Sequence, residues 1–177
     1  MSNTTKTNGR DQGELWKGLV AGLIGGLVAS WAMNRFQDVW FKLSESAQPE
    51  EQGAENQSTN DDTTVKAASA ISEGLFDHKL TTDEKKIAGP AVHYSLGTGV
   101  GGLYGAVAEV VPEVTSGAGL PFGMAFWLIV DESAVPMLGL SKGPTQYPVS
   151  THAYALTSHL VYGLTAEAVR RGLRKAL

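Results

Sequence analysis

Four long runs of apolar and small residues, separated by charged or polar segments, make up most of the chain. The runs cover residues 18–34, 87–108, 114–140 and 143–166, and the third contains Asp131 and Glu132. A transmembrane helix needs roughly 20 mostly apolar residues, and the runs lack the polar stripe that a helix face in water requires. The pattern predicts an all-α fold, a four-span transmembrane helical bundle. Four buried helices of a soluble bundle are the alternative.

We expect the transmembrane helices at residues 15–34, 89–112, 118–140 and 149–170. The connector at residues 35–88 has an acidic middle with few large apolar side chains, which predicts partial disorder. Its apolar positions near residues 65–76 have helical spacing, which predicts a short amphipathic helix at the membrane interface. Thr81 or Thr82 is the expected N-cap ahead of the second span.

Basic residues gather at both ends of the chain. Residues 1–14 and 171–177 are the expected tails, and the basic positions in or beside them are Lys6, Arg10, Lys17, Arg170, Arg171, Arg174 and Lys175. Basic residues that flank membrane spans stay in the cytoplasm, and an even number of spans returns the chain to its starting side. Both termini are therefore expected to be cytoplasmic, and the connector faces outward.

The composition excludes several classes of site and partner. The chain has no cysteine, which excludes disulfides and thiolate metal ligands. Its net charge of -4 gives no basic footprint for nucleic acid. The expected partners are the lipid bilayer and a second copy of the chain or another membrane protein.

Small residues recur at every fourth position in the first two spans. The two stripes are Gly18, Gly22, Gly26 and Ser30, and Gly97, Gly101 and Gly105. In lipid there is little hydrophobic force between helices, so small residues that let backbones touch provide the packing. The stripes predict close helix–helix contacts.

A six-residue motif occurs twice. Tyr104 and Gly105 begin a Tyr-Gly-x-x-Ala-Glu sequence that ends at Glu109, and a second copy runs from Tyr162 and Gly163 to Glu167. His93 precedes the first copy and His152 the second, and Gly-Leu-x-x-Gly begins at both Gly18 and Gly119. The repeat predicts two parallel-repeated helical hairpins, related by an axis along the membrane normal. Chance similarity among glycine-rich helices is the alternative.

Seven ionisable residues lie within or at the ends of the predicted spans, on the glycine-rich or inward faces. A charge at the bilayer centre costs about 2.5–3.5 kcal/mol on insertion scales, so such residues point inward and pair. They are the candidate residues for a polar core or a proton relay: His93, Glu109, Asp131, Glu132, His152, His159 and Glu167.

Three hypotheses for these residues stay open. The first is structural: Glu109 and Glu167 pair with arginines near the membrane surface, as in a subunit without chemistry. The second is proton or small-ion handling, the favoured working function, linked to envelope stress. In it His152 is the outer entry, Asp131, Glu132 and His159 pass the proton on, and Glu109 with Glu167 is the inner exit. The third is a metal or haem site; the cofactor is left unknown, and an enzyme is not expected.

The C-terminal half resembles a known family. The stretches "YGAVAEVVPEV", "PMLGLSKGP" and "SHLVYGLTAEAVRRGLRK" are similar to the YagU-like family of uncharacterised bacterial inner-membrane proteins, over roughly residues 93–175 and without the acidic connector. The resemblance implies a multi-pass protein of the bacterial inner (plasma) membrane. It implies no activity and no cofactor.

Overall fold

The structure is a computed structural model that describes residues 4–47 and 52–177, with side chains described from residues 14 to 44 and from 63 onward. These residues form helices and loops and no strand, so the all-α prediction is confirmed. The long helices are α1 (Thr4–Ala47), α2 (Gln52–Phe76), α3 (Thr82–Val110), α4 (Leu120–Ile129) and α6 (Val149–Ala176). The short elements are η1 (Pro112–Gly119), the π-helical η2 (Val130–Ala134), α5 (Val135–Met137) and η3 (Pro144–Gln146).

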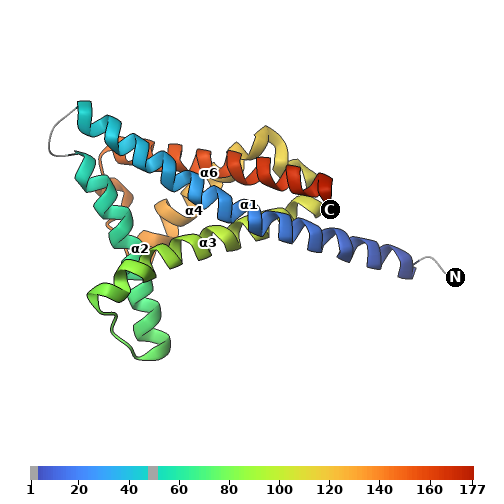
Figure 1. Cartoon of the computed structure of the whole chain (residues 1–177), viewed down its shortest axis with the longest axis horizontal. Helices are drawn as coiled ribbons and strands as arrows, with labels where there is room; N and C mark the ends of the chain where they lie inside the picture. Colours follow the sequence, from blue (N-terminus) through green and yellow to red (C-terminus); the bar gives the residue numbers. More distant parts are fainter. Residues whose placement is uncertain (1–3, 48–51) are drawn as a thin grey trace.

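Three long helices form the body of the bundle (Figure 1). α1 packs against α3 and α6, and α4 packs against α6. α2 runs across the end of the bundle that lies opposite the C-terminus, and it packs mainly on α3. The beginning of α1 and the end of α6 lie toward the same end of the molecule, as an even number of crossings would require.

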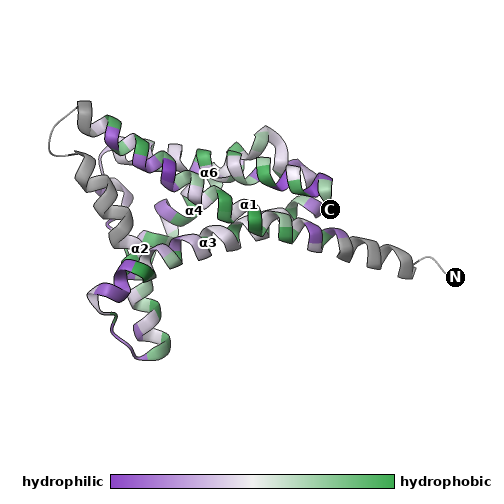
Figure 2. Cartoon of the chain, in the orientation of Figure 1, coloured by the Kyte–Doolittle hydropathy of each residue, from purple (hydrophilic) through white to green (hydrophobic). Residues whose placement is uncertain are grey.

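Two helical segments are long and apolar enough to cross a membrane, Glu14–Ser44 and Pro112–Met137. Only 39% and 17% of their apolar windows are buried inside the protein, whereas the core helix of a soluble protein is mostly buried. Green hydrophobic positions occur along α1 (Figure 2), and Ile24, Leu27 and Trp31 of this helix are exposed. Among the described residues, α3 and α6 do not pass the same test, because glycine, hydroxyl and ionisable positions lower their hydropathy. By length and composition, two of the four predicted spans are supported.

The connector is more helical than the sequence suggested. α1 continues through Ala47, and α2 begins at Gln52 and replaces both the expected disorder and the shorter helix near residues 65–76. Residues 48–51, in the middle of the predicted disordered segment, lie outside the described residues. The α2 sequence contains four alanines and no proline; alanine is the best helix former and proline the strongest helix breaker.

α3 begins at Thr82 rather than at residue 89, because a capping box stands at Thr81. The Thr81 hydroxyl accepts a hydrogen bond from the Glu84 backbone N–H at 3.4 Å, and the Glu84 carboxylate accepts one from the Thr81 N–H at 2.7 Å. This confirms Thr81 as the N-cap. These bonds hold the pKa of Glu84 below its ordinary value.

The predicted third span is a series of short elements instead of one helix. In the second half of η1 the chain turns through Gly117 and Gly119, whose φ angles of 70° and 87° favour glycine. α4 follows, and the chain widens into a π turn at η2, where the Ser133 hydroxyl donates to the carbonyl O of Leu128 at 2.8 Å. This π turn lies just before Pro136.

Glycines bring the backbones of α1 and α3 into direct contact, as their spacing predicted. A Cβ atom on Gly101 would lie 2.5 Å from Gly26 Cα, and one on Gly105 would lie 2.7 Å from Gly22 Cα. A matching contact joins α4 to α6, because a Cβ on Gly163 would lie 2.9 Å from Gly123 Cα. Close backbone packing therefore holds both helix pairs together.

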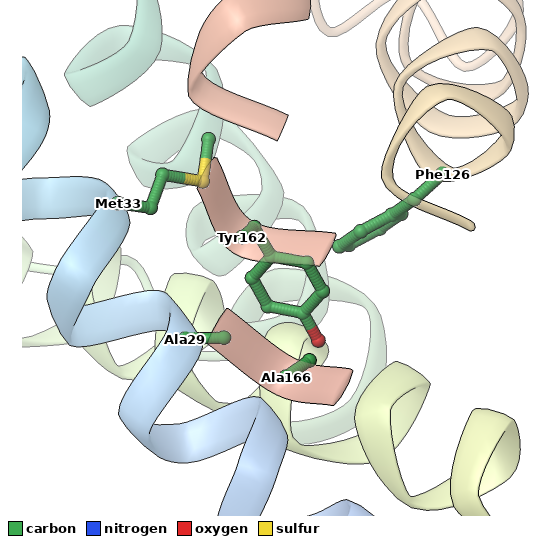
Figure 3. Packing of buried hydrophobic residues seen from close by; sticks show 5 residues of the cluster. All are labelled: Ala29, Met33, Phe126, Tyr162 and Ala166. Atoms are coloured by element: carbon green, nitrogen blue, oxygen red, sulfur yellow. The ribbon is translucent and has the colours of Figure 1, made fainter. Parts of the chain in front are cut away.

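The buried apolar core lies where α1, α4 and α6 meet (Figure 3). Tyr162 and Phe126 contact each other edge to face, with ring centroids 5.1 Å apart. Around them pack Ala29, Met33 and Ala166. This core separates the two groups of ionisable residues described below.

Candidate functional site

The π turn at η2 presents two neighbouring carboxylates to α6. Glu132 Oε1 lies 2.6 Å from His152 Nδ1, and Asp131 Oδ2 lies 3.6 Å from His159 Nδ1. The two histidines are seven residues apart on α6, about 10 Å at roughly 1.5 Å per residue. We call these four residues the polar ladder. Short π turns inside α-helices occur often at functional sites.

His152 uses both ring nitrogens. Nε2 lies 3.0 Å from the carbonyl O of Pro144, which only accepts, so Nε2 donates. The short Nδ1 contact with Glu132 needs another hydrogen, on either the imidazole or the carboxyl group. The pair therefore shares one exchangeable proton.

Two cavities adjoin the polar ladder. The larger has a volume of about 160 Å³, and its lining includes Asn34, His93, Asp131, His159 and Tyr162. The smaller has a volume of about 70 Å³, and its lining includes Glu132, Lys142 and His152. Asp131, Thr63 and Val135 line both cavities. The ladder thus follows a polar space that begins at the loop before α6 and reaches the middle of the bundle.

Aromatic residues close the inner end of this space. Phe126 stands edge-on to the His159 ring at 5.1 Å, and the Tyr162 hydroxyl donates to the carbonyl O of Gly97 at 2.5 Å. Beyond them, Phe122 stacks on Tyr104 with ring centroids 4.0 Å apart. The polar space therefore ends at the apolar core.

A separate set of charges lies on the far side of the core, near the end of α6. Its members are Glu109, Glu167, Arg170, Arg171 and Arg174, which we call the terminal ion cluster. Glu167 is buried and accepts hydrogen bonds from Arg170 Nε at 2.7 Å, from the Tyr104 hydroxyl at 2.9 Å and from Arg171. Its partners lie on both α3 and α6, so the cluster joins these helices.

Arg174 connects a third helix to the cluster. Its guanidinium donates to Glu109 at 2.6 and 2.8 Å and also to Glu14 of α1. The hydrogen bonds with Glu109 raise the pKa of Arg174 above its ordinary value, so the residue stays charged. Charge-assisted bidentate pairs of this kind fix geometry as well as adding stability.

The structure divides the seven predicted residues into two groups. It places Asp131, Glu132, His152 and His159 in the polar ladder, and His93 on the wall of the larger cavity. It places Glu109 and Glu167 in the terminal ion cluster. Within the described part of the chain, no group of three or more histidine or acidic residues could hold a metal ion.

The two copies of the repeated motif make different contacts at tyrosine and similar contacts at glycine. The Tyr104 hydroxyl bonds to Glu167, whereas that of Tyr162 bonds to a backbone carbonyl. Gly105 and Gly163 each meet the backbone of the partner helix.

Sequence reasoning missed several residues of these sites. Asn34, from the first span, lines the larger cavity, and Thr63 lies where the two cavities join. Of these residues, Asn34 could have been identified from the sequence, because an amide side chain in an apolar run is costly unless it forms a hydrogen bond. It donates to the Tyr94 hydroxyl at 3.2 Å.

Comparison with known proteins gives one match. Residues 55–168 match the model of a family described as "Protein of unknown function (DUF1440)". The match begins inside the acidic connector, which lies outside the stretches that carry the YagU-like resemblance. No curated protein and no solved structure matches the chain.

Proposed function

Because the chain belongs to DUF1440, a family of unknown function, we propose from its structure that it is a multi-pass membrane protein that conducts protons or small ions along the polar ladder. The proposed setting is the bacterial inner membrane, where YagU-like proteins are placed, with both termini in the cytoplasm. Two helices long and apolar enough to cross a bilayer support the membrane assignment.

The exposed surface favours a bilayer as solvent. Large apolar side chains point outward from the body of the bundle, with Leu27 49%, Leu103 64% and Ile129 63% exposed. In water, contiguous apolar patches of this kind are rare on a monomer. In lipid they are the expected outer surface, and the buried polar side chains Ser158, His159 and Glu167 of α6 face inward.

We propose that α3 and α6 are the second and fourth spans and that the bundle is a duplicated hairpin. Related glycine pairs support the duplication: Gly22 meets Gly105 in the first helix pair, and Gly123 meets Gly163 in the second. The motif alignment relates these same positions. Parallel repeats with polar sites near the middle of the membrane are common in transporters.

One observation is central to the proposed conduction. The short contact between His152 and Glu132 requires a shared proton, and the next carboxylate on the chain, Asp131, faces His159 farther along α6. Imidazole and carboxyl groups can each take up and release a proton. The four groups therefore suit stepwise proton transfer.

The conformation described here is closed on one side. The aromatic core lies between the polar ladder and the terminal ion cluster, so a proton that reaches His159 meets Phe126 and Tyr162. Conduction then needs the aromatic core to open, which is the expected behaviour of a gated pathway rather than a continuous pore.

The experiment uses the full-length protein in liposomes that contain a pH-sensitive dye. A potassium diffusion potential drives proton uptake, and we expect the wild-type protein to acidify the lumen faster than empty liposomes. Asp131→Asn should remove this uptake, while Asp83→Asn, which changes an exposed carboxylate in the same way, should keep it. Equal uptake by the wild type and Asp131→Asn would contradict proton conduction along the ladder.

The alternative is a structural or partner-binding membrane subunit without chemistry. The terminal ion cluster favours it, because bonds from Arg174 and Arg170 tie α1, α3 and α6 together and need no transported ion. In that case Asp131→Asn would change thermal stability or assembly but no flux.

The proposed role of ion handling in envelope stress has its own test. Cells that contain the wild type are compared with cells that contain Asp131→Asn for their survival in acid.

A further inference from the structure

We propose that the larger cavity binds a small organic ammonium ion, with the Asp131 carboxylate as its counter-ion. The inference rests on the proposed function in one respect: the ammonium ion would bind at Asp131, the same carboxylate that is proposed to carry the proton. It concerns a cavity, a charge and an aromatic wall that proton transfer alone does not require.

The first support is the position of Asp131. Its carboxylate oxygen lies 3.6 Å from His159 Nδ1, which is longer than a hydrogen bond, and its side chain is 31% exposed toward the cavities that it lines. His159 Nδ1 lies closer to the carbonyl O of Ala155, at 2.9 Å, and donates to it. The carboxylate thus has room for a donor that comes from the cavity.

The second support is the charge of the lining. Asp131 is the only carboxylate among the described residues that line the larger cavity, and no lysine or arginine is among them. A single negative charge in a confined apolar and hydroxyl-lined space attracts a cation and repels an anion. The site therefore selects a solute with one positive charge.

The third support is the size and aromatic character of the cavity. Its volume of about 160 Å³ is close to that of an engineered cavity of about 150 Å³ that binds benzene. The rings of Phe126 and Tyr162 are part of the wall, and aromatic faces stabilise ammonium ions by about 0.5–2 kcal/mol. These features fit an alkylammonium ion of about five to eight heavy atoms better than a bare metal ion.

A shared carboxylate makes the two ligands exclusive. While the ammonium ion occupies Asp131, the same oxygens cannot accept a proton, so the ammonium ion and a proton compete for this carboxylate. The titratable groups nearest to Asp131 are Glu132 on its own element, His152 and His159 on α6, His93 on α3 and Lys142 in the loop after α5.

The test is calorimetric titration of the purified full-length protein in detergent, near neutral pH, with n-butylammonium. Butyrate and 1-butanol are the matched anionic and neutral probes of similar length. We expect n-butylammonium to bind and the other two probes to bind at least ten-fold more weakly. Equal affinity for n-butylammonium and 1-butanol, or no heat of binding for n-butylammonium, would overturn the inference.

Two variants test whether n-butylammonium binds at Asp131. Asp131→Asn should weaken n-butylammonium binding at least ten-fold, and Asp83→Asn should bind as the wild type does. Tyrosine and tryptophan near-ultraviolet dichroism shows that each variant keeps its packing; if Asp131→Asn unfolds, Phe126→Leu replaces it and should weaken binding about three-fold or more. Unchanged binding in the folded variant overturns the inference. Binding without proton flux in liposomes would contradict only the proposed conduction, and flux without binding would contradict only the ammonium site.

Discussion

The glycine contact between α1 and α3 allows a quantitative prediction from two neighbouring positions on one helix. A Cβ atom on Gly101 would lie 2.5 Å from Gly26 Cα, 2.7 Å from Gly22 O and 2.8 Å from Gly26 N. All three are backbone atoms, which cannot rotate away. At Gly99, two residues earlier on α3, a Cβ would meet nothing within 4 Å. We therefore compare Gly101→Ala with Gly99→Ala.

The expected difference in the free energy of unfolding follows from what the two variants share. Each replaces glycine by alanine inside α3, and the gain in helix propensity, about 1 kcal/mol, is common to both. Only Gly101→Ala forces the helices apart, and overpacking of this kind costs about 1–3 kcal/mol. The free energy of unfolding should then be about 1–3 kcal/mol lower for Gly101→Ala than for Gly99→Ala.

The assay is thermal unfolding in detergent micelles, followed by far-ultraviolet circular dichroism. For a chain of this size, 1 kcal/mol corresponds to about 2–4 °C in Tm, so we expect Gly101→Ala to unfold at least 2 °C below Gly99→Ala. If Gly101→Ala is as stable as Gly99→Ala, α1 and α3 do not pack through their backbones.

Three further predictions test other parts of the structure. Gly163→Ala should lower Tm relative to Gly172→Ala, whose Cβ would meet nothing within 4 Å, and equal Tm values would count against the related contact in the second helix pair. Tyr104→Phe should destabilise the protein by about 1.5–3 kcal/mol, the value of a hydrogen bond to a charged group, because it leaves buried Glu167 with one donor fewer; an unchanged midpoint of chemical unfolding would refute this. Glu84 has a pKa below its ordinary value because of hydrogen bonds from the N-cap threonine, so its stabilisation of α3 is complete above the ordinary titration range and is lost as the pH falls through the lowered pKa. Amide exchange at the start of α3 should therefore accelerate in acid in the wild type and change less in Glu84→Gln.

The features that the sequence predicted best depend on local spacing. The four-residue period of Gly22, Gly26, Gly101 and Gly105 predicts which faces touch, since a helix returns to the same face about every fourth residue. Thr81 followed by Glu84 predicts a helix start for a similarly local reason. In both cases the residues that act together are close in sequence or repeat regularly.

The partners of the ionisable residues depend on tertiary packing, and the sequence specified them less well. The adjacent Asp131 and Glu132 suggest a shared role, but which histidine each one faces depends on the π turn, which no residue pattern in this segment marks. Arg170 and Arg171 lie three and four residues after Glu167, so their pairing could be predicted from helical spacing. The bond from Arg174 to Glu109 joins two helices and could not.

The third predicted span shows a second limit of prediction from the sequence. Hydropathy alone joins residues 118–140 into one apolar segment, but the chain turns at Gly119 before α4 and widens into the π turn η2 between α4 and α5. Average hydropathy measures solvent preference and does not report backbone geometry. Average hydropathy is also low in α3 and α6, because glycine, hydroxyl and ionisable positions interrupt their apolar residues.

The central claim is that α6, with its two histidines, crosses a lipid bilayer. The chain has no cysteine, so Lys142→Cys and Lys175→Cys each introduce a single thiol, one before and one near the end of α6. In sealed right-side-out vesicles, a membrane-impermeant maleimide should label Lys142→Cys at once and should label Lys175→Cys only after the vesicles are opened. Labelling of both variants in sealed vesicles, or recovery of the protein in the soluble fraction, would contradict the claim.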